Sequence, residues 1–170
     1  MLPLVPVDCP IDIVFVVDFD YNRFSLMKSY LSHIVSRLDI DGGSTRVGLV
    51  SFTTEVVDVF NLTAHSSLES LLFATLFLTV YDGVTNTSAA LHYVRTRMLT
   101  SAAGNRNGVQ NTVVVITDGK SNWSTVVSCL LFSTGVLLYC NRHAMVVWLI
   151  GNVSVPGTIF RFDCLHGSWA

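Results

Sequence analysis

Several oxygen-bearing side chains follow apolar segments or stand in one polar loop, where they could bind a metal ion together. They are Asp18, Asp20, Thr85, Thr87 and Asp118. Carboxylates and hydroxyls, without imidazole or thiolate, are the donors that hard divalent cations prefer. The chemistry they indicate is binding of Mg²⁺, Mn²⁺ or Ca²⁺. An aspartate at a strand end is also a common cap for the following helix, and both readings stay open here.

The segments before Asp18 and Asp118 predict buried strands. Ile11–Val17 and Thr112–Thr117 are short, apolar and rich in β-branched residues, which is typical of parallel strands covered on both faces. Further strands are predicted at 46–52, 56–62, 135–140, 144–150 and 158–162. The segment 56–62 is expected to be antiparallel, at an edge of the sheet.

Helices are predicted between these strands. Over 23–38 apolar residues recur at helical spacing, as in Phe24, Met27, Leu31 and Ile34, and the other helices are predicted at 67–76, 88–99 and 124–132. Alternating strands and helices predict a doubly wound α/β fold, with a mostly parallel central sheet and helices on both faces. Such sheets bind ligands at the carboxyl ends of their strands, which is where the candidate metal ligands fall.

Composition narrows the class of protein. The chain has 170 residues, 51% hydrophobic and 13% charged, with a formal net charge of −2. This length suits one domain, and the charge argues against nucleic-acid binding because no basic patch could neutralise phosphates. The most apolar stretch, Val126–Gly151, is interrupted at 141–143. We therefore favour buried strands, or a strand and a helix, over a membrane-spanning helix, and expect no membrane insertion.

Four cysteines and four sequons favour a secreted protein. Domain termini are often close together, so a Cys9–Cys164 disulfide would tie the two ends, while Cys129 and Cys140 are either buried free thiols or a second bridge. The N-x-S/T sequons predict glycosylation at Asn61, Asn86, Asn122 and Asn152. Met1–Val7 lacks the basic start and long apolar core of a signal peptide.

A set of motifs in order resembles the von Willebrand factor type A (VWA) domain. They are Cys-Pro-Ile-Asp-Ile-Val-Phe-Val-Val-Asp (9–18), Ile-Val-Ser-Arg-Leu-Asp-Ile (34–40), Thr-Arg-Val-Gly-Leu-Val-Ser-Phe (45–52), Thr-Asn-Thr (85–87), Ala-Leu-His-Tyr-Val (90–94) and Val-Ile-Thr-Asp-Gly-Lys-Ser-Asn (115–122). The chain is most similar to the VWA domains of matrix proteins such as collagen VI and matrilins. The resemblance covers about residues 9–140. It implies a doubly wound, Rossmann-like fold, an extracellular adhesion role and a metal-ion-dependent adhesion site, whose cation completes its shell with a partner's carboxylate.

The resemblance also identifies where this chain departs from the family's site. Asp18, Thr85 and Asp118 match the two aspartates and the threonine of the pattern, but the two serines after the first aspartate are absent. The loop is about four residues short. Counted from Asp18, Asp20 and Asn22 stand at the two serine positions; counted back from Phe24, Asn22 belongs to the helix start and the serine loop is missing. We therefore expect a degenerate site, with Asp18, Asp20, Thr85 and Asp118 as its ligands. A glycan on Asn86 would stand beside it.

The sequence predicts a non-enzymatic module. It contains none of the Gly-x-Ser-x-Gly, Gly-x-x-x-x-Gly-Lys-Ser/Thr, Gly-x-Gly-x-x-Gly and His-Glu-x-x-His motifs, and its histidines share no ligand spacing. We expect an extracellular, secreted adhesion module that binds matrix proteins such as collagens, or a metal-free oligomerisation domain of a larger matrix protein. The domain is predicted at 9–164, with 1–8 as a linker or cloning remnant. Beyond Cys140 the family pattern fades, and a truncated or divergent C-terminal part is expected.

Overall fold

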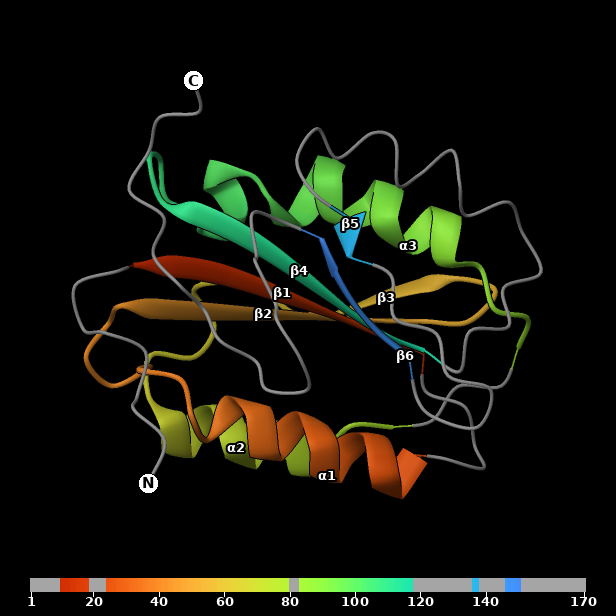
Figure 1. The fold of residues 1–170 in the computed structure, drawn as a ribbon, viewed down its shortest axis with the longest axis horizontal. Helices are drawn as coiled ribbons and strands as arrows, with labels where there is room; N and C mark the ends of the chain where they lie inside the picture. The colour runs from red at the N-terminus through yellow and green to blue at the C-terminus, as the bar shows by residue number, and fades with distance from the viewer. Residues whose placement is uncertain (1–9, 19–23, 80–82, 118–135, 138–145, 151–170) are drawn as a thin grey trace.

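The computed structural model describes residues 10–18, 24–79, 83–117, 136–137 and 146–150. Eleven elements lie within them (Figure 1). In chain order they are β1 Ile11–Asp18, α1 Phe24–Val35, β2 Thr45–Phe52, β3 Val56–Phe60, α2 Leu68–Leu76, α3 Thr87–Tyr93, the π-helical turn η2 Val94–Met98, the 3-10 turn η3 Ser101–Ala103, β4 Gln110–Thr117, β5 Val136–Leu137 and β6 Val146–Ile150.

The strands form one mixed sheet in the order β3-β2-β1-β4-β6-β5. The central strand β1 pairs in parallel with β2 on one side and with β4 on the other. β3 joins β2 antiparallel, as the sequence predicted for this edge, and β6 joins both β4 and β5 antiparallel. The parallel centre brings the carboxyl ends of β1, β2 and β4 to one edge of the sheet.

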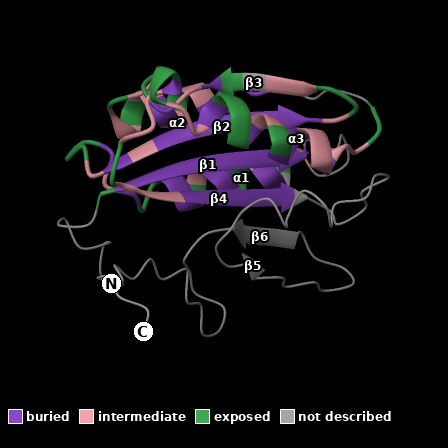
Figure 2. Cartoon of the chain, turned by 90° about the horizontal axis from the view of Figure 1, so that it is seen from above, coloured by how far each residue is buried: buried purple, intermediate pink, exposed green. Residues whose placement is uncertain are grey.

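Helices cover both faces of the sheet, which confirms the predicted doubly wound α/β architecture. Figure 1 shows α1 and α2 on one face and α3 on the other. Alternate residues of β1 supply two separate cores, because successive strand side chains point to opposite faces. Ile13, Phe15 and Val17 pack with α1 and α2, whereas Val14 and Val16 pack with α3 and η2. Figure 2 shows the three central strands, β2, β1 and β4, buried along most of their length.

The helix predicted at 88–99 begins one residue earlier, at Thr87, and its α-helical part ends at Tyr93. Asn86 caps α3, since its Oδ1 accepts a hydrogen bond from the amide of Ala89 at 3.1 Å. After Tyr93 the backbone widens into the π-helical turn η2, in which the Leu99 amide donates to the Val94 carbonyl at 2.9 Å. This turn seats Met98 on β2, where a Cβ on Gly48 would stand 2.9 Å from the Met98 methyl.

α1 and α2 begin within one residue of their predicted starts. α1 ends at Val35 rather than Leu38, because the chain turns there to reach β2. Ser67 caps α2 and accepts from the amide of Ser70 at 3.3 Å. The predicted helix 124–132 and strand 158–162 lie outside the described residues.

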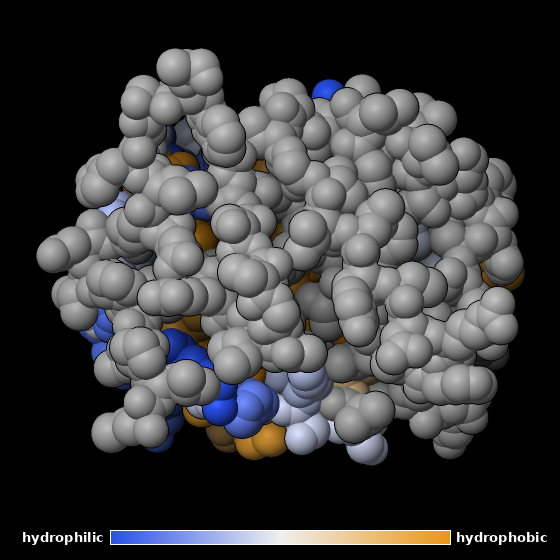
Figure 3. All heavy atoms as spheres, in the orientation of Figure 1, coloured by the Kyte–Doolittle hydropathy of each residue, from blue (hydrophilic) through white to orange (hydrophobic). Residues whose placement is uncertain are grey.

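The surface mixes polar and apolar side chains. Along the lower edge of the face in Figure 3, over α1, the described residues include both hydrophilic and hydrophobic ones. Among the described residues, the most exposed large apolar side chains are Phe73, Leu76 and Phe77, in the last turn of α2 and just after it. The rings of Phe73 and Phe77 lie 4.7 Å apart. Within the described part of the chain, no helix has the length and apolarity to cross a membrane.

Candidate functional site

The candidate site is built around Asp18, the last residue of β1. Its side chain is 4% exposed and belongs to the face of the sheet that α3 covers. The Thr85 hydroxyl donates a hydrogen bond to its Oδ2 at 3.2 Å. The structure thus joins two of the predicted ligands, which are 67 positions apart in the chain.

The loop that carries Thr85 is held against the end of β2. The amide of Val84 donates to the Thr54 hydroxyl at 2.8 Å, and the amide of Asn86 donates to the Thr53 carbonyl at 2.9 Å. The Asn86 cap then fixes the start of α3. These three contacts position Thr85 from both sides, so that its hydroxyl points at Asp18. Thr87, the other threonine singled out from the sequence, is buried as the first residue of α3.

The end of β4 lies beside the end of β1. Ile116 pairs with Val17, so Thr117 stands level with Asp18 across the sheet. Asp118 follows directly in the sequence, but it lies outside the described residues, as does Asp20. Their part in the site therefore stays a prediction.

The donors that the structure brings together suit a hard cation in type but are few in number. A carboxylate and a hydroxyl are oxygen ligands of the kind that Mg²⁺, Mn²⁺ and Ca²⁺ prefer, and these ions take six or more. Among the described residues, no group of three or more His, Cys, Asp or Glu side chains could hold a metal ion. A cation at Asp18 and Thr85 would need further ligands from the adjoining loops, water or a partner.

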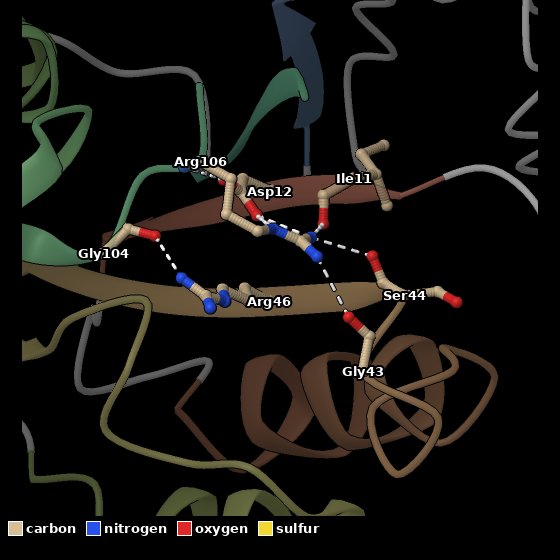
Figure 4. A network of polar contacts seen from close by, with 7 residues as sticks. All are labelled: Ile11, Asp12, Gly43, Ser44, Arg46, Gly104 and Arg106. Carbon is tan, nitrogen blue, oxygen red and sulfur yellow. Dashed lines mark hydrogen bonds and ion pairs between the residues drawn. The ribbon is translucent and has the colours of Figure 1, made fainter. Parts of the chain in front are cut away.

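The opposite end of the sheet carries a charged network that the sequence reading did not single out (Figure 4). Asp12 in β1 has a fully buried side chain, and Arg106 lies over it in the loop before β4. The Arg106 Nε and backbone amide donate to the Asp12 carboxylate at 2.8 and 2.7 Å. Its guanidinium also donates to the carbonyls of Ile11, Ser44 and Gly43 at 2.8 to 3.0 Å.

This network fastens the amino ends of β1 and β2 to the loop before β4. One sequence signal pointed to it: Asp12 interrupts an otherwise apolar buried strand, and a buried carboxylate requires a charged or hydrogen-bonding partner. Nothing in the local sequence identifies Arg106 as that partner. Because Asp12 and Asp18 stand at opposite ends of β1, the network is separate from the candidate cation site.

The remaining predicted sites fall partly within the structure. Asn61, just after β3, and Asn86 are described, and both are partly exposed. The sequons at Asn122 and Asn152 and the cysteines Cys9, Cys129, Cys140 and Cys164 lie outside the described residues. Both disulfide proposals are therefore untested.

Fold and site together define a doubly wound α/β domain with an acidic and hydroxyl-bearing edge at the carboxyl ends of its parallel strands. A model of the von Willebrand factor type A domain matches residues 12–140, and the chain belongs to this family.

The relatives include proteins of the extracellular matrix. The chain is 32% identical over 152 residues to integrin alpha-2 of Bos taurus, covering 81% of this chain and 13% of the relative. It is 36% identical over 118 residues to matrilin-1 of Mus musculus, covering 65% and 24%. It is 36% identical over 120 residues to the collagen alpha-4(VI) chain of Mus musculus, covering 66% and 5%. The chain thus spans less than a quarter of the length of these relatives.

Solved structures bear out the fold. The chain is similar to proximal thread matrix protein 1 from the mussel byssus in a structure described as having a zinc-occupied MIDAS motif. The TM-score is 0.65 at 26% identity, over 76% of this chain and 34% of that one. A second structure of the same protein gives a TM-score of 0.64 at 22% identity, over 74% and 34%.

Proposed function

We propose that this chain is a non-enzymatic protein-binding module of an extracellular matrix protein. In this proposal it binds matrix proteins such as collagens through the edge that carries Asp18 and Thr85. A cation there, Mg²⁺ or else Mn²⁺ or Ca²⁺, is held by Asp18, Asp20, Thr85 and Asp118 in a degenerate metal-ion-dependent adhesion site. The contact between the Thr85 hydroxyl and the Asp18 carboxylate, at 3.2 Å on the carboxyl edge of the sheet, is the observation that carries this proposal.

Coordination number and charge explain how a cation at the carboxyl ends of the parallel strands would bind a partner. A divalent cation needs six or more oxygens, and the four proposed side chains supply four if each binds through one oxygen, so coordination positions remain for a carboxylate of the partner. With Asp20 in place of a neutral serine, the site carries one more negative charge. That charge weakens the attraction of the cation site for an acidic partner. We therefore expect partner binding to depend less on the cation than it would with a neutral serine in place of Asp20.

A metal-free structural role is the second candidate, and the same contact favours it. The Thr85 hydroxyl already gives the nearly buried Asp18 carboxylate a hydrogen bond without any cation. On this reading the chain is an oligomerisation domain of a larger matrix protein and binds through another face.

Calorimetric titration of the chain with Mg²⁺, Mn²⁺ and Ca²⁺ separates the two candidates. If a cation binds, we expect a saturable heat in the unmodified chain. The affinity for the cation should be at least about tenfold lower in Asp18→Asn, Thr85→Val and Asp118→Ala, because each removes a ligand. Glu69→Gln, which removes an exposed carboxylate on α2, is the control and should leave the heat unchanged. Absence of any saturable heat would contradict the metal-dependent proposal. Sedimentation of the same sample would then measure its oligomeric state and test the second candidate.

The domain limits are also part of the proposal. We place one domain at 9–164, closed by a Cys9–Cys164 disulfide in an extracellular setting. The support is the position of the two cysteines near the two ends of the given sequence, with Cys9 three residues before the matched region 12–140 and Cys164 24 residues after it. Peptide mapping of the secreted chain without reduction should recover the two cysteines in one linked peptide pair.

A further inference from the structure

We infer that Asn61 carries an N-linked glycan that stands on the β3 edge of the domain, away from the candidate cation site. This inference rests on the extracellular setting of the proposed function, but not on the cation or on the partner. The sequon Asn61-Leu62-Thr63 alone marks the position as one of several. The local structure and its place in the sheet distinguish it from Asn86, the other sequon among the described residues.

The folded chain leaves the acceptor nitrogen of Asn61 available. The Asn61 Oδ1 accepts hydrogen bonds from both the amide and the hydroxyl of Thr63, each at 3.0 Å. No contact within the described residues uses its Nδ2, which is the atom that takes the sugar. Attachment at Nδ2 therefore preserves the local hydrogen bonds, since the oxygen remains an acceptor after the linkage forms.

The backbone around the sequon is fixed while its outer side chains face solvent. Leu62 is 1% exposed and its amide donates to the Ala103 carbonyl at 3.0 Å. Thr63 and Ala64 are exposed. Because the middle residue points into the core next to η2, the flanking residues are directed outward. A bulky, solubilising glycan needs such a surface position.

Register places Asn61 well away from Asp18. Asp18 pairs with Phe52, whereas Asn61 follows Phe60, which pairs with Leu49. The Asn61 backbone also approaches Gly48, where a Cβ would stand 3.6 Å from its carbonyl carbon. Gly48 is four residues before Phe52 along β2, or about 13 Å at the strand rise. β3 is also the outermost strand on its side, so the glycan would project from the edge of the sheet.

Asn86 offers an internal comparison. Its Oδ1 caps α3, and it directly follows Thr85, whose hydroxyl contacts Asp18. A glycan on Asn86 would stand beside the candidate site, whereas one on Asn61 leaves that end of the sheet accessible to a partner. The glycan on Asn61 would also screen β3, the outermost strand on that side and apolar except for Asp58, from pairing with another chain.

The attachment is a group transfer by the oligosaccharyl transferase of the secretory pathway. The Asn61 Nδ2 forms a bond to C1 of the first sugar of a lipid-pyrophosphate-linked oligosaccharide. The bond from C1 to the pyrophosphate oxygen breaks, the lipid pyrophosphate leaves with the electron pair, and one Nδ2 proton passes to a base of the transferase.

The test is to secrete the full 170-residue chain from mammalian cells behind a leader peptide and to release its glycans with peptide N-glycosidase in heavy-oxygen water. Mass spectrometry should find Asn61 converted to isotope-labelled aspartate in most molecules. Asn61→Gln and Thr63→Ala should each lose one glycan by gel mobility, and Thr63→Ser should retain it. Asn86→Asp keeps the cap of α3 but removes that acceptor, and it should leave the label at Asn61 unchanged.

The result that would overturn the inference is a secreted chain in which Asn61 stays unlabelled, whether or not another sequon is labelled. Should Asn61→Gln fail to be secreted, Thr63→Ala and Thr63→Ser decide the question with Asn61 intact. A negative cation titration would not affect this result, because occupancy of Asn61 is read from peptide mass alone.

Discussion

At the scale of single residues, Asp12 and Arg106 form the most consequential pair in the described structure. A buried carboxylate is stable only when its charge is compensated, and Arg106 provides two hydrogen bonds to it while also bonding three carbonyls. Arg106 is one-fifth exposed, so it reaches the surface while Asp12 does not. The pair therefore acts as a structural fastening of the sheet rather than as a reactive site.

Removing the Arg106 guanidinium should lower the stability of the domain. We expect Arg106→Met to lower the free energy of unfolding by about 3–5 kcal/mol, because it leaves Asp12 buried and uncompensated. Arg46→Met is the matched control, since Arg46 donates a single hydrogen bond to the Gly104 carbonyl at 2.7 Å. It should cost about 1–2 kcal/mol. Urea unfolding followed by tryptophan fluorescence measures both, and equal losses in the two variants would contradict the role given to Asp12.

His65 gives a second prediction at this scale, through pH. Burial against Phe60, whose ring meets it edge-on at 4.7 Å, lowers the pKa of His65 from its usual 6.5. A lowered pKa means that the folded chain binds fewer protons than the unfolded chain near pH 6.5. The contribution of neutral His65 to the free energy of unfolding is therefore fully present above pH 6.5. It is lost as the pH falls through the folded-state pKa. We expect the urea midpoint to fall less between about pH 7.5 and about pH 5.5 in His65→Gln than in the wild type. An unchanged fall would show that other groups carry the dependence.

At the scale of elements, the loop after η3 contains two glycines that differ in how closely other residues pack against them. Gly104 has φ of +90°, and a Cβ there would collide with the Thr63 side chain. Gly108 has φ of +76° with open space around it. The two glycines share the left-handed conformation and differ in crowding.

This difference predicts unequal costs for the same substitution. Gly108→Ala should cost about 1 kcal/mol, the strain of a left-handed alanine, whereas Gly104→Ala should cost about 2–4 kcal/mol because overpacking adds to that strain. Thermal unfolding monitored by circular dichroism compares them. If the two variants melt together, the contact between Gly104 and Thr63 does not constrain the turn.

The elements also show how far the fold could be read from sequence. β1, β2 and α2 lie within one residue of their predicted limits, because an apolar run or a helical period is a local signal. The π-helical turn at Val94–Met98 was missed, since its last residue, Met98, packs close to Gly48 in a strand far along the chain, and a local pattern does not record such a contact. At the candidate site, the convergence of Asp18 and Thr85 followed from the rule of strand ends. The supporting contacts of Thr53 and Thr54 did not, because they depend on where one loop meets another.

At the scale of the whole molecule, the sheet lies between two apolar cores among the described residues. Ile34 belongs to the core under α1 and α2, and Leu91 to the core under α3. Both cores rest on β1, so they should melt in one transition.

Substitutions in the two cores should therefore add. We expect Ile34→Val to cost about 0.5–1.5 kcal/mol and Leu91→Ala about 2–5 kcal/mol. The double variant should equal their sum within about 0.5 kcal/mol, because the sites lie on opposite faces of the sheet. Urea titration by two probes, fluorescence and far-ultraviolet circular dichroism, measures the cycle. A coupling well above that limit would mean that the sheet transmits strain between its faces.

The sequence by itself determined the alternation of strands and helices, the doubly wound class and the acidic strand end at Asp18, because each is encoded in a few neighbouring residues. Only the tertiary structure decided that Arg106 compensates Asp12 across 94 positions, that the Thr85 hydroxyl meets Asp18, and that β6 joins β4 antiparallel. Local periodicity specifies an element and the face it buries. It does not specify which distant side chain comes to lie against it, because that depends on how all the elements pack at once.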